Sequence, residues 1–337
     1  MRRISTIAVV LAAAGAVALL AACGGQDDAG AAGGDGDGAN LSLVAYSTPR
    51  EAYEEIIPAF QESQSGAGAS FEQSYASSGE QSRAVEAGLP ADIVAFSLAP
   101  DMDRLVEAGL VADDWASNEY AGMVTDSVVV LAVRKGNPEN IQGWEDLVRD
   151  DVEVITPNPF TSGGARWNIM AAYGAQLELG KSEDEAVEYL RQLFANVSVQ
   201  DKSARESLQT FSGGKGDVLL AYENEAIFAQ QNGEELDYVV PDQTILIENP
   251  VAVTTDAPDA AQGFVDFLYT PEAQTIFGEK GYRPVVEDVL AEFDYQEPPA
   301  LFTIEELGGW DKVSETFFDR ETGIMADINE NLGVPTE

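Results

Sequence analysis

Histidine is absent from the 337 residues of this chain, and cysteine occurs once, at Cys23. Without histidine there is no Ser-His-Asp or Cys-His catalytic arrangement and no histidine ligand for a metal ion. Carboxylates are scattered over positions typical of solvated helix faces, such as Glu183-Asp184-Glu185. We therefore expect no catalytic residue, no metal site and no cofactor, and do not expect an enzyme. A single thiol allows no internal disulfide, so the fold must depend on its apolar core.

Basic residues are scarce as well. The 18 lysines and arginines face 59 aspartates and glutamates, which gives a formal net charge of −41. Such a surface repels nucleic acid and anionic lipid, so neither is expected as a partner. It also repels an anionic ligand at long range, although exposed charges more than about 8–10 Å apart are largely screened in physiological salt. A bound anion would have to be held by hydrogen-bond donors at short range.

The first residues have the composition of an export signal. Arg2-Arg3 precedes an apolar run from about Ile7 to Leu20 that is too short for a membrane span, and Leu20-Ala-Ala-Cys23 follows. This order predicts a lipoprotein signal peptide over residues 1–22, with lipid on Cys23 anchoring the chain to the outer face of the cell membrane. Residues 23–40, rich in Gly, Ala and Asp, are predicted to be a flexible tether. The alternative is an ordinary signal peptide with an incidental cysteine.

Beyond the tether, short apolar runs alternate with amphipathic stretches, which is typical of α/β layers. About 300 residues remain, enough for two lobes. Strands are expected at 41–46, 69–73, 92–96, 127–133, 152–155, 218–222, 238–240 and 251–254. Helices are expected at 50–61, 79–87, 102–108, 164–176, 183–194, 204–211, 224–230, 259–268 and 271–278.

Three polar loops each follow a predicted strand, at residues 46–51, 73–81 and 157–166. The spacing of Thr48 and Glu51 predicts a capping box, and Ser78 and Gln81 have the same spacing. Any one of these loops is explained as well by a helix cap as by a binding site. Because ligands of open α/β sheets bind beyond the carboxyl ends of strands, the three together indicate a site.

The third loop has the residues of an anion cradle. In Asn158-Pro-Phe-Thr-Ser-Gly-Gly-Ala-Arg166, a hydroxyl and two glycines stand at a predicted helix start. Glycine lets the backbone approach a ligand closely, and the first amides of a helix have no partner within it. Those amides, with the positive end of the helix dipole, favour an anion.

Several separate motifs resemble the sulfate-binding proteins of ABC importers, with similarity from about Leu41 to the region of Phe318. The motifs are Asn158-Pro-x-Thr-Ser-Gly-Gly-Ala-Arg166-Trp167, Gln73-Ser74 with Ser78-Gly79-x-Gln81, Ala221-Tyr-Glu-Asn-Glu-Ala226, Tyr282-Arg-Pro284, and Leu301-Phe-Thr-Ile304 with Gly308-Gly-Trp310. The resemblance implies an α/β, bilobal periplasmic-binding-protein fold of the second type. Lobe 1 would comprise residues 41–126 and 251–337, the latter including a C-terminal segment, and lobe 2 residues 127–250.

The resemblance also implies a function. The chain would capture sulfate between the lobes, close about two chain crossovers near Ser127 and Val251, and deliver the anion to ABC transporter permease subunits. We expect it to act as a monomer. The family's sulfate contacts fall on the amides of Ser47, Ser78, Gly163, Gly164 and Ala204, on the Ser162 hydroxyl, with a further contact from the Ser78 hydroxyl, and on Tyr222.

Three positions depart from the family pattern. Tyr222 stands where relatives have an indole donor, Ser47 where they often have aspartate, and Phe160 where they usually have lysine. Asn158 and Arg166 are expected to support the cradle, Arg166 through a carboxylate or carbonyl. Glu80 and Glu223 are expected to point outward or to form caps.

Chemistry favours the same ligand. Sulfate only accepts hydrogen bonds near neutral pH, so a site made of donors suits it, whereas protonated phosphate needs an acceptor. The sequence leaves open thiosulfate, molybdate, tungstate or phosphate as the ligand. Two other classes of protein also remain open: a secreted ester hydrolase and an adhesive surface lipoprotein in which the serine loops are plain caps.

Overall fold

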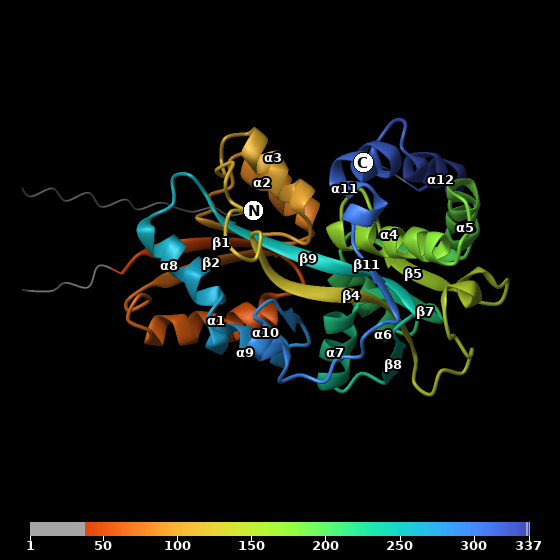
Figure 1. Cartoon of the computed structure of the whole chain (residues 1–337), viewed down its shortest axis with the longest axis horizontal. Coiled ribbons are helices and arrows are strands. Elements are labelled where there is room, and N and C mark those ends of the chain that lie inside the picture. The colour runs from red at the N-terminus through yellow and green to blue at the C-terminus, as the bar shows by residue number, and fades with distance from the viewer. Residues whose placement is uncertain (1–37, 335, 337) are drawn as a thin grey trace, which may run out of the picture. The chain divides into compact units, whose positions relative to one another are not determined.

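The computed structural model describes residues 38–334 and residue 336, in which helices and strands alternate as the sequence predicts (Figure 1). The predicted signal peptide and Cys23 lie outside the described residues. The strands are β1 (Asn40–Tyr46), β2 (Ser70–Ala76), β3 (Ile93–Ala95), β4 (Met123–Arg134), β5 (Val154–Pro157), β6 (Val197–Asp201), β7 (Val218–Tyr222), β8 (Leu236–Val239), β9 (Gln243–Val253), β10 (Arg283–Pro284) and β11 (Ala300–Phe302). The α-helices are α1 (Arg50–Glu62), α2 (Ser78–Glu86), α3 (Ala99–Glu107), α4 (Gly163–Glu178), α5 (Glu183–Ala195), α6 (Ala204–Ser212), α7 (Glu223–Gln231), α8 (Asp259–Leu268), α9 (Pro271–Glu279), α10 (Glu287–Leu290), α11 (Gly309–Phe318) and α12 (Ile324–Leu332).

Two long antiparallel strands, β4 and β9, connect two half-sheets. The strand order is β2-β1-β3-β9-β4-β7-β5-β6, with β1, β2 and β3 parallel in one half and β5, β6 and β7 parallel in the other. The first part of β4, up to Val128, pairs with β9, and the part from Val129 pairs with β7. The strand therefore passes from one half-sheet to the other. β9 reaches β3 at residues 251–253. These two strands are the crossovers of the bilobal fold.

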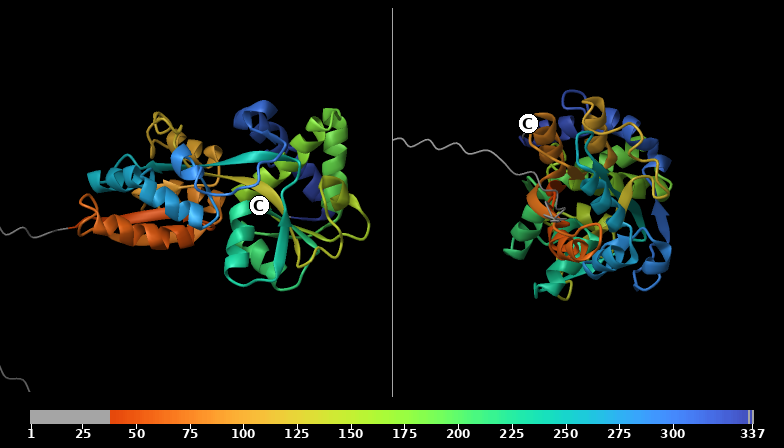
Figure 2. Two further views of the ribbon diagram at one scale, coloured as in Figure 1. Left: turned by 60° about the horizontal axis from the view of Figure 1, so that its bottom comes forward. Right: turned by 90° about the vertical axis from the view of Figure 1, so that its left-hand side faces the viewer.

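Apolar cores lie on both sides of these strands. One contains aromatic side chains of α1, α8 and α9, including Phe60 and Phe264, whose ring centroids are 5.1 Å apart. In Figure 2 the red-orange α1 and the light-blue α8 and α9, far apart in sequence, cover the same half. The other core centres on α4 and α5 and includes Trp167. The C-terminal helices α11 and α12 pack against this second core.

The middle of β4 shows why a crossover strand forms here. Residues 128–133 are Val-Val-Val-Leu-Ala-Val, and all six are buried. A continuous apolar run rich in β-branched valine suits a strand covered on both faces. The predicted strand at 251–254 missed residues 243–250 of β9, because Asn249-Pro250 resembles a loop. The short β6 was also missed, since its alternation of valine and polar residues is weak.

Both predicted capping boxes are wrong. α1 begins at Arg50 after Pro49, and the Thr48 hydroxyl is hydrogen-bonded to the Tyr282 hydroxyl, 2.9 Å away. α2 begins at Ser78, so Ser77 is its N-cap residue. The hydroxyls of Thr48 and Ser78, which the local pattern assigned to caps, instead bond Tyr282 and Asp101, which are distant in the sequence.

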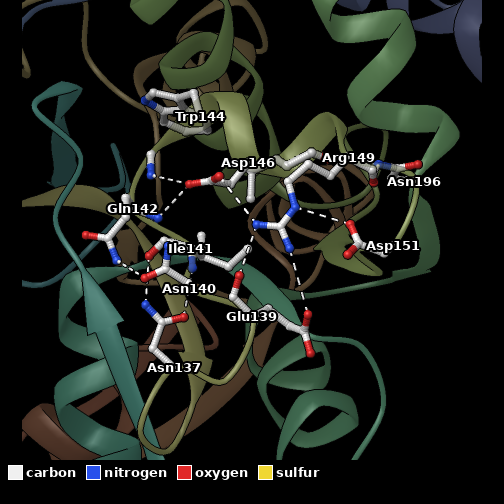
Figure 3. A network of polar contacts seen from close by, with 12 residues as sticks. Asn137, Glu139, Asn140, Ile141, Gln142, Trp144, Asp146, Arg149, Asp151 and Asn196 are labelled. Atoms are coloured by element: carbon white, nitrogen blue, oxygen red, sulfur yellow. Dashed lines mark hydrogen bonds and ion pairs between the residues drawn. The ribbon is translucent and has the colours of Figure 1, made fainter.

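The loop between β4 and β5 is held by its own polar network, shown in Figure 3. Arg149 bonds the Glu139 carbonyl at 3.0 Å and the carboxylates of Asp146 and Asp151 at 3.4 and 3.2 Å. None of the helices in the described part of the chain has the length and hydropathy of a membrane span.

Candidate functional site

A small cavity lies where several strands end and several helices begin. Its volume of about 10 Å³ is far below the roughly 300–1,000 Å³ usual for drug-sized ligands. Its lining comes from the segments after β1, β2, β3, β5, β6 and β7, as the strand-end argument predicts. The lining residues are Tyr46, Ser47, Thr48, Ser77, Ser78, Ser97, Ser162, Gly164, Ala204 and Tyr222.

The cavity has no charged side chain among its described lining residues, but three helix N-termini give it a positive potential. α2, α4 and α6 begin there at Ser78, Gly163 and Ala204. Amides in the first turn of a helix lack intrahelical partners, and the helix dipole adds positive potential. The arrangement therefore favours a compact anion.

Six of the seven predicted contact residues line this cavity: Ser47, Ser78, Ser162, Gly164, Ala204 and Tyr222. Gly163 adjoins it at the start of α4. A Cβ on Gly163 would lie 2.0 Å from Ser97 Oγ and 2.3 Å from Leu98 Cδ2, whereas one on Gly164 would meet ordinary contacts at 3.5 Å. Glycine is thus needed at 163 because the β3–α3 loop approaches so closely.

The loop from Asn158 is folded back on itself. The Asn158 side chain accepts a hydrogen bond from the Phe160 amide at 2.8 Å. The backbone carbonyl of Asn158 accepts from the backbone amides of Thr161 and Ser162 at 3.2 and 2.9 Å. Ser162 caps α4, because its Oγ accepts from the Ala165 amide at 3.4 Å. The Ser162 hydroxyl thus accepts a bond from the helix and can donate its own proton toward the cavity.

Ser78 contributes differently from Ser162. Its hydroxyl donates to Asp101 Oδ2 at 2.6 Å and accepts from the Ser97 amide at 3.0 Å. Because the single hydroxyl proton is used by Asp101, the backbone amide is the donor that Ser78 can offer a ligand. Of the two ligand contacts predicted for Ser78, the backbone amide is therefore retained and the hydroxyl is not.

Three hydroxyls around the cavity are buried without a hydrogen-bond partner in the described part of the chain: those of Tyr46, Ser97 and Tyr222. Leaving a buried hydroxyl unpaired costs about 1–3 kcal/mol, so three in one cavity indicate a ligand site. Burial raises the pKa of Tyr222 well above its ordinary value. The side chains of Ser97 and Asn249 lie near enough to the phenol to oppose this shift, although neither forms a hydrogen bond of acceptable geometry with it. The phenol therefore keeps its proton and can donate it.

Tyr46 and Ser97 were missed by sequence reasoning. Each stands at or just after the end of an apolar strand, as the recognised loops do. Ser97 is a single serine after Phe96, without the run of hydroxyls and glycines that marks the other loops. The position was informative, but the local composition was not.

The expectation for Glu223 is wrong. Its side chain is 1% exposed, and Arg283 Nε donates to it at 2.9 Å. Burial raises the pKa of Glu223, and the Arg283 guanidinium opposes that shift. The partner lies 60 residues away on β10, which no local pattern at Glu223 could reveal. Glu80 accepts a hydrogen bond from Ser77 Oγ at 2.7 Å.

Arg166 bonds one of the two kinds of partner expected of it. Its Nε donates to the Pro159 carbonyl at 3.0 Å, and its guanidinium lies over the Phe318 ring. Phe160, at the position where the resemblance predicts lysine, is fully buried. Arg166 therefore supports the loop at residues 158–166 through the Pro159 carbonyl.

Arg205, next to Ala204, joins the two halves of the fold beside the cavity. It binds both carboxylate oxygens of Glu51 at 2.6 and 2.9 Å and both of Glu225 at 2.9 and 3.0 Å, and it donates to the Thr48 carbonyl at 3.1 Å. Glu51 and Thr48 come from the β1–α1 segment, and Glu225 from α7. The guanidinium is therefore shared between the halves.

Comparison with known proteins gives the same picture. Residues 41–283 match the model of a family described as bacterial extracellular solute-binding protein. A sulfate-binding protein of Synechococcus elongatus is 41% identical over 317 residues, covering 90% of each chain, and one of Synechocystis is 44% identical, covering 88% of each. A thiosulfate-binding protein of Pseudomonas aeruginosa is 36% identical, covering 82% of this chain and 89% of its own.

A solved structure is also similar. The sulfate-binding protein SubI from Mycobacterium tuberculosis superposes with a TM-score of 0.81 at 42% identity. The match covers 83% of this chain and 99% of that one.

Proposed function

The chain belongs to the family of bacterial extracellular solute-binding proteins, and from that premise we propose that it binds sulfate in the described cavity and delivers it to an ABC permease. The single observation that carries the ligand assignment is the cavity lining, which combines helix amides and unpaired hydroxyls with no charged side chain among the described lining residues. Sulfate accepts hydrogen bonds and donates none. A shell of donors satisfies it without leaving a carboxylate facing an anion.

The proposed contacts are the amides of Ser47, Ser78, Gly163, Gly164 and Ala204 and the hydroxyls of Ser162 and Tyr222. Solute-binding proteins are transport components, and this assignment needs no chemical step. Binding energy is used to favour the state in which both halves surround the anion. The strands β4 and β9 are the segments about which we propose that closure occurs.

Isothermal titration of the purified protein with sulfate, thiosulfate, phosphate and molybdate tests the ligand. We expect sulfate to bind most tightly. Tyr222→Phe should weaken sulfate by the amount typical of one lost charge-assisted hydrogen bond, about ten- to hundredfold. Tyr222→Trp should keep binding if the indole N–H reaches the same oxygen. Protein that binds none of the four anions, yet is folded, would contradict the proposal.

Thiosulfate is the second candidate ligand, and a specific observation favours it. Relatives named for thiosulfate are 34–36% identical to this chain over most of its length. Thiosulfate is also a dianion that accepts hydrogen bonds, so the same donors would hold it. Competition between sulfate and thiosulfate in one titration decides between them.

We further propose that the protein is exported and lipid-anchored through Cys23, and that it acts as a monomer. Export and the lipid anchor are supported by the order of Arg2-Arg3, an apolar run and Leu20-Ala-Ala-Cys23. Cell fractionation of a Cys23→Ala variant tests the anchor. A variant that is processed normally and yet stays as membrane-bound as the wild type would contradict it.

A further inference from the structure

Ser97 lies in the loop between β3 and α3, outside the motifs that identify the site. The residue is 1% exposed, and its Oγ lies near the Tyr222 phenol but forms no hydrogen bond of acceptable geometry within the described part of the chain. It lines the same cavity as Ser162, Gly164 and Tyr222. A buried polar atom without a partner inside a cavity calls for an explanation, and a ligand supplies one.

The backbone of Ser97 is fixed on both sides. Its amide donates to Ser78 Oγ at 3.0 Å, while its carbonyl accepts from Trp167 Nε1 at 2.7 Å and from Asn249 Nδ2 at 3.0 Å. These three partners belong to α2, α4 and β9. The side chain therefore starts from a backbone that cannot shift easily, which is the condition for a preorganised contact.

The Oγ also stands at the head of α4. A Cβ built on Gly163 would lie 2.0 Å from it, so the hydroxyl packs directly against the first residue of that helix. The Ser162 hydroxyl and the first amides of α4 lie in the same region. The Ser97 hydroxyl thus adds a donor from the β3–α3 loop to those supplied by the cradle.

We infer that Ser97 is a further ligand contact whose hydroxyl donates a hydrogen bond to an oxygen of the bound anion. This inference rests on the proposed function. It adds the loop after β3 to the segments that hold the ligand. Ser97 would then contact the anion through its hydroxyl and Trp167 through its carbonyl.

Replacing Ser97 with alanine tests the inference. Ser97→Ala keeps the three backbone hydrogen bonds and removes only the hydroxyl, so we expect sulfate affinity measured by calorimetry to fall about ten- to hundredfold. The melting temperature of the ligand-free variant should be unchanged or raised, because an unpaired buried hydroxyl has been removed. A purely structural role would instead lower it.

Ser314→Ala is the matched control. Ser314 in α11 also has a buried hydroxyl without a partner among the described residues, but it does not line the cavity. Sulfate affinity of this variant should equal that of the wild type. Wild-type affinity in Ser97→Ala would overturn the inference, and so would an affinity loss matched by an equal loss of ligand-free stability. If the wild type itself bound neither sulfate nor thiosulfate, the proposed function would fail, which is a separate and distinguishable result.

Discussion

Arg205 in α6 binds Glu51 in α1 through two hydrogen bonds of 2.6 and 2.9 Å, and this pair connects the two halves of the fold beside the cavity. The Arg205 side chain is 15% exposed and that of Glu51 27%, so solvent screens the pair only partly. Glu225 lies in the same half as Arg205 and keeps it in place. Loss of the Glu51 carboxylate should therefore weaken the contact between the halves, which would then depend on the bond from Arg205 to the Thr48 carbonyl.

Glu51→Gln should therefore weaken the closed state more than the fold. We expect sulfate affinity to fall about five- to thirtyfold, corresponding to about 1–2 kcal/mol, between the values for exposed and buried ion pairs. Glu55→Gln, on the same helix and paired with Lys280, is the control. Calorimetry of both variants makes the comparison, and equal affinities would show that the Arg205–Glu51 pair does not support binding.

Ser162→Ala should lose both a helix cap and a ligand contact. The cap contributes about 0.5–2 kcal/mol to stability, and the ligand bond about ten- to hundredfold in affinity. Ser182→Ala removes the comparable cap of α5, where the Ser182 hydroxyl accepts from the Glu185 amide at 3.3 Å. We expect similar melting temperatures for the two variants but an affinity loss in Ser162→Ala alone. Affinity loss in both would assign the effect to helix capping.

Gly163→Ala and Gly164→Ala should differ in stability. The Cβ at 163 would come within 2.0 Å of Ser97 Oγ and 2.3 Å of a Leu98 methyl, whereas the Cβ at 164 meets neighbours no closer than 3.5 Å. Overpacking of this kind destabilises a fold by about 1–3 kcal/mol. Denaturant unfolding of the ligand-free variants should show the loss at 163. A more destabilised Gly164→Ala variant would mean that the β3–α3 loop does not pack on α4 in solution.

Stability should fall with rising pH through Asp126. Burial and the Glu248 carboxylate raise the pKa of Asp126 to about 7, against the opposing effect of Arg283. The fold therefore favours the protonated acid. Its contribution is fully present below the unfolded value, near pH 4, and is lost as the pH rises through about 7.

Asp126→Asn stays neutral, so it should be more stable than the wild type at pH 8, by about 1–3 kcal/mol after allowing for partial solvent exposure, and nearly equal to it at pH 4. Urea unfolding across that range measures the difference. Asp237→Asn is the control, since Lys135 holds the pKa of Asp237 below its ordinary value. A gap between Asp126→Asn and the wild type that stayed constant with pH would show that Asp126 does not titrate in this window.

Local patterns predicted the elements well where periodicity and length were both clear. β7 and α8 have the predicted bounds, and the start of α4 after Ser162 was predicted to within one residue. The short β10 and β11 and the C-terminal helices α10, α11 and α12 were not predicted. β10 and β11 are only two and three residues long and are defined by pairing with β4 and β9, so their own sequences carry little signal.

The site was predictable where the backbone makes it and less so where distant side chains do. Helix starts and glycines near Gly164 follow from local sequence. The partners of Glu223 and Glu51 do not, because Arg283 and Arg205 reach them from residues 60 and 154 positions away. Ser97 was missed because it is a single serine without the hydroxyls and glycines of the other loops, and its position against Gly163 depends on tertiary packing.

If a shell of uncharged donors selects a fully ionised anion, competitive calorimetry with sulfate and phosphate from pH 5 to 8 should separate the two ligands. Sulfate keeps its charge over this range, and Asp126 does not line the cavity, so sulfate affinity should stay nearly constant. Phosphate carries a proton that would meet donors, and it should bind weakly at every pH. Phosphate binding as tight as that of sulfate at pH 8 would rule out selection by donors alone, because it would require an acceptor such as a carboxylate to face the anion.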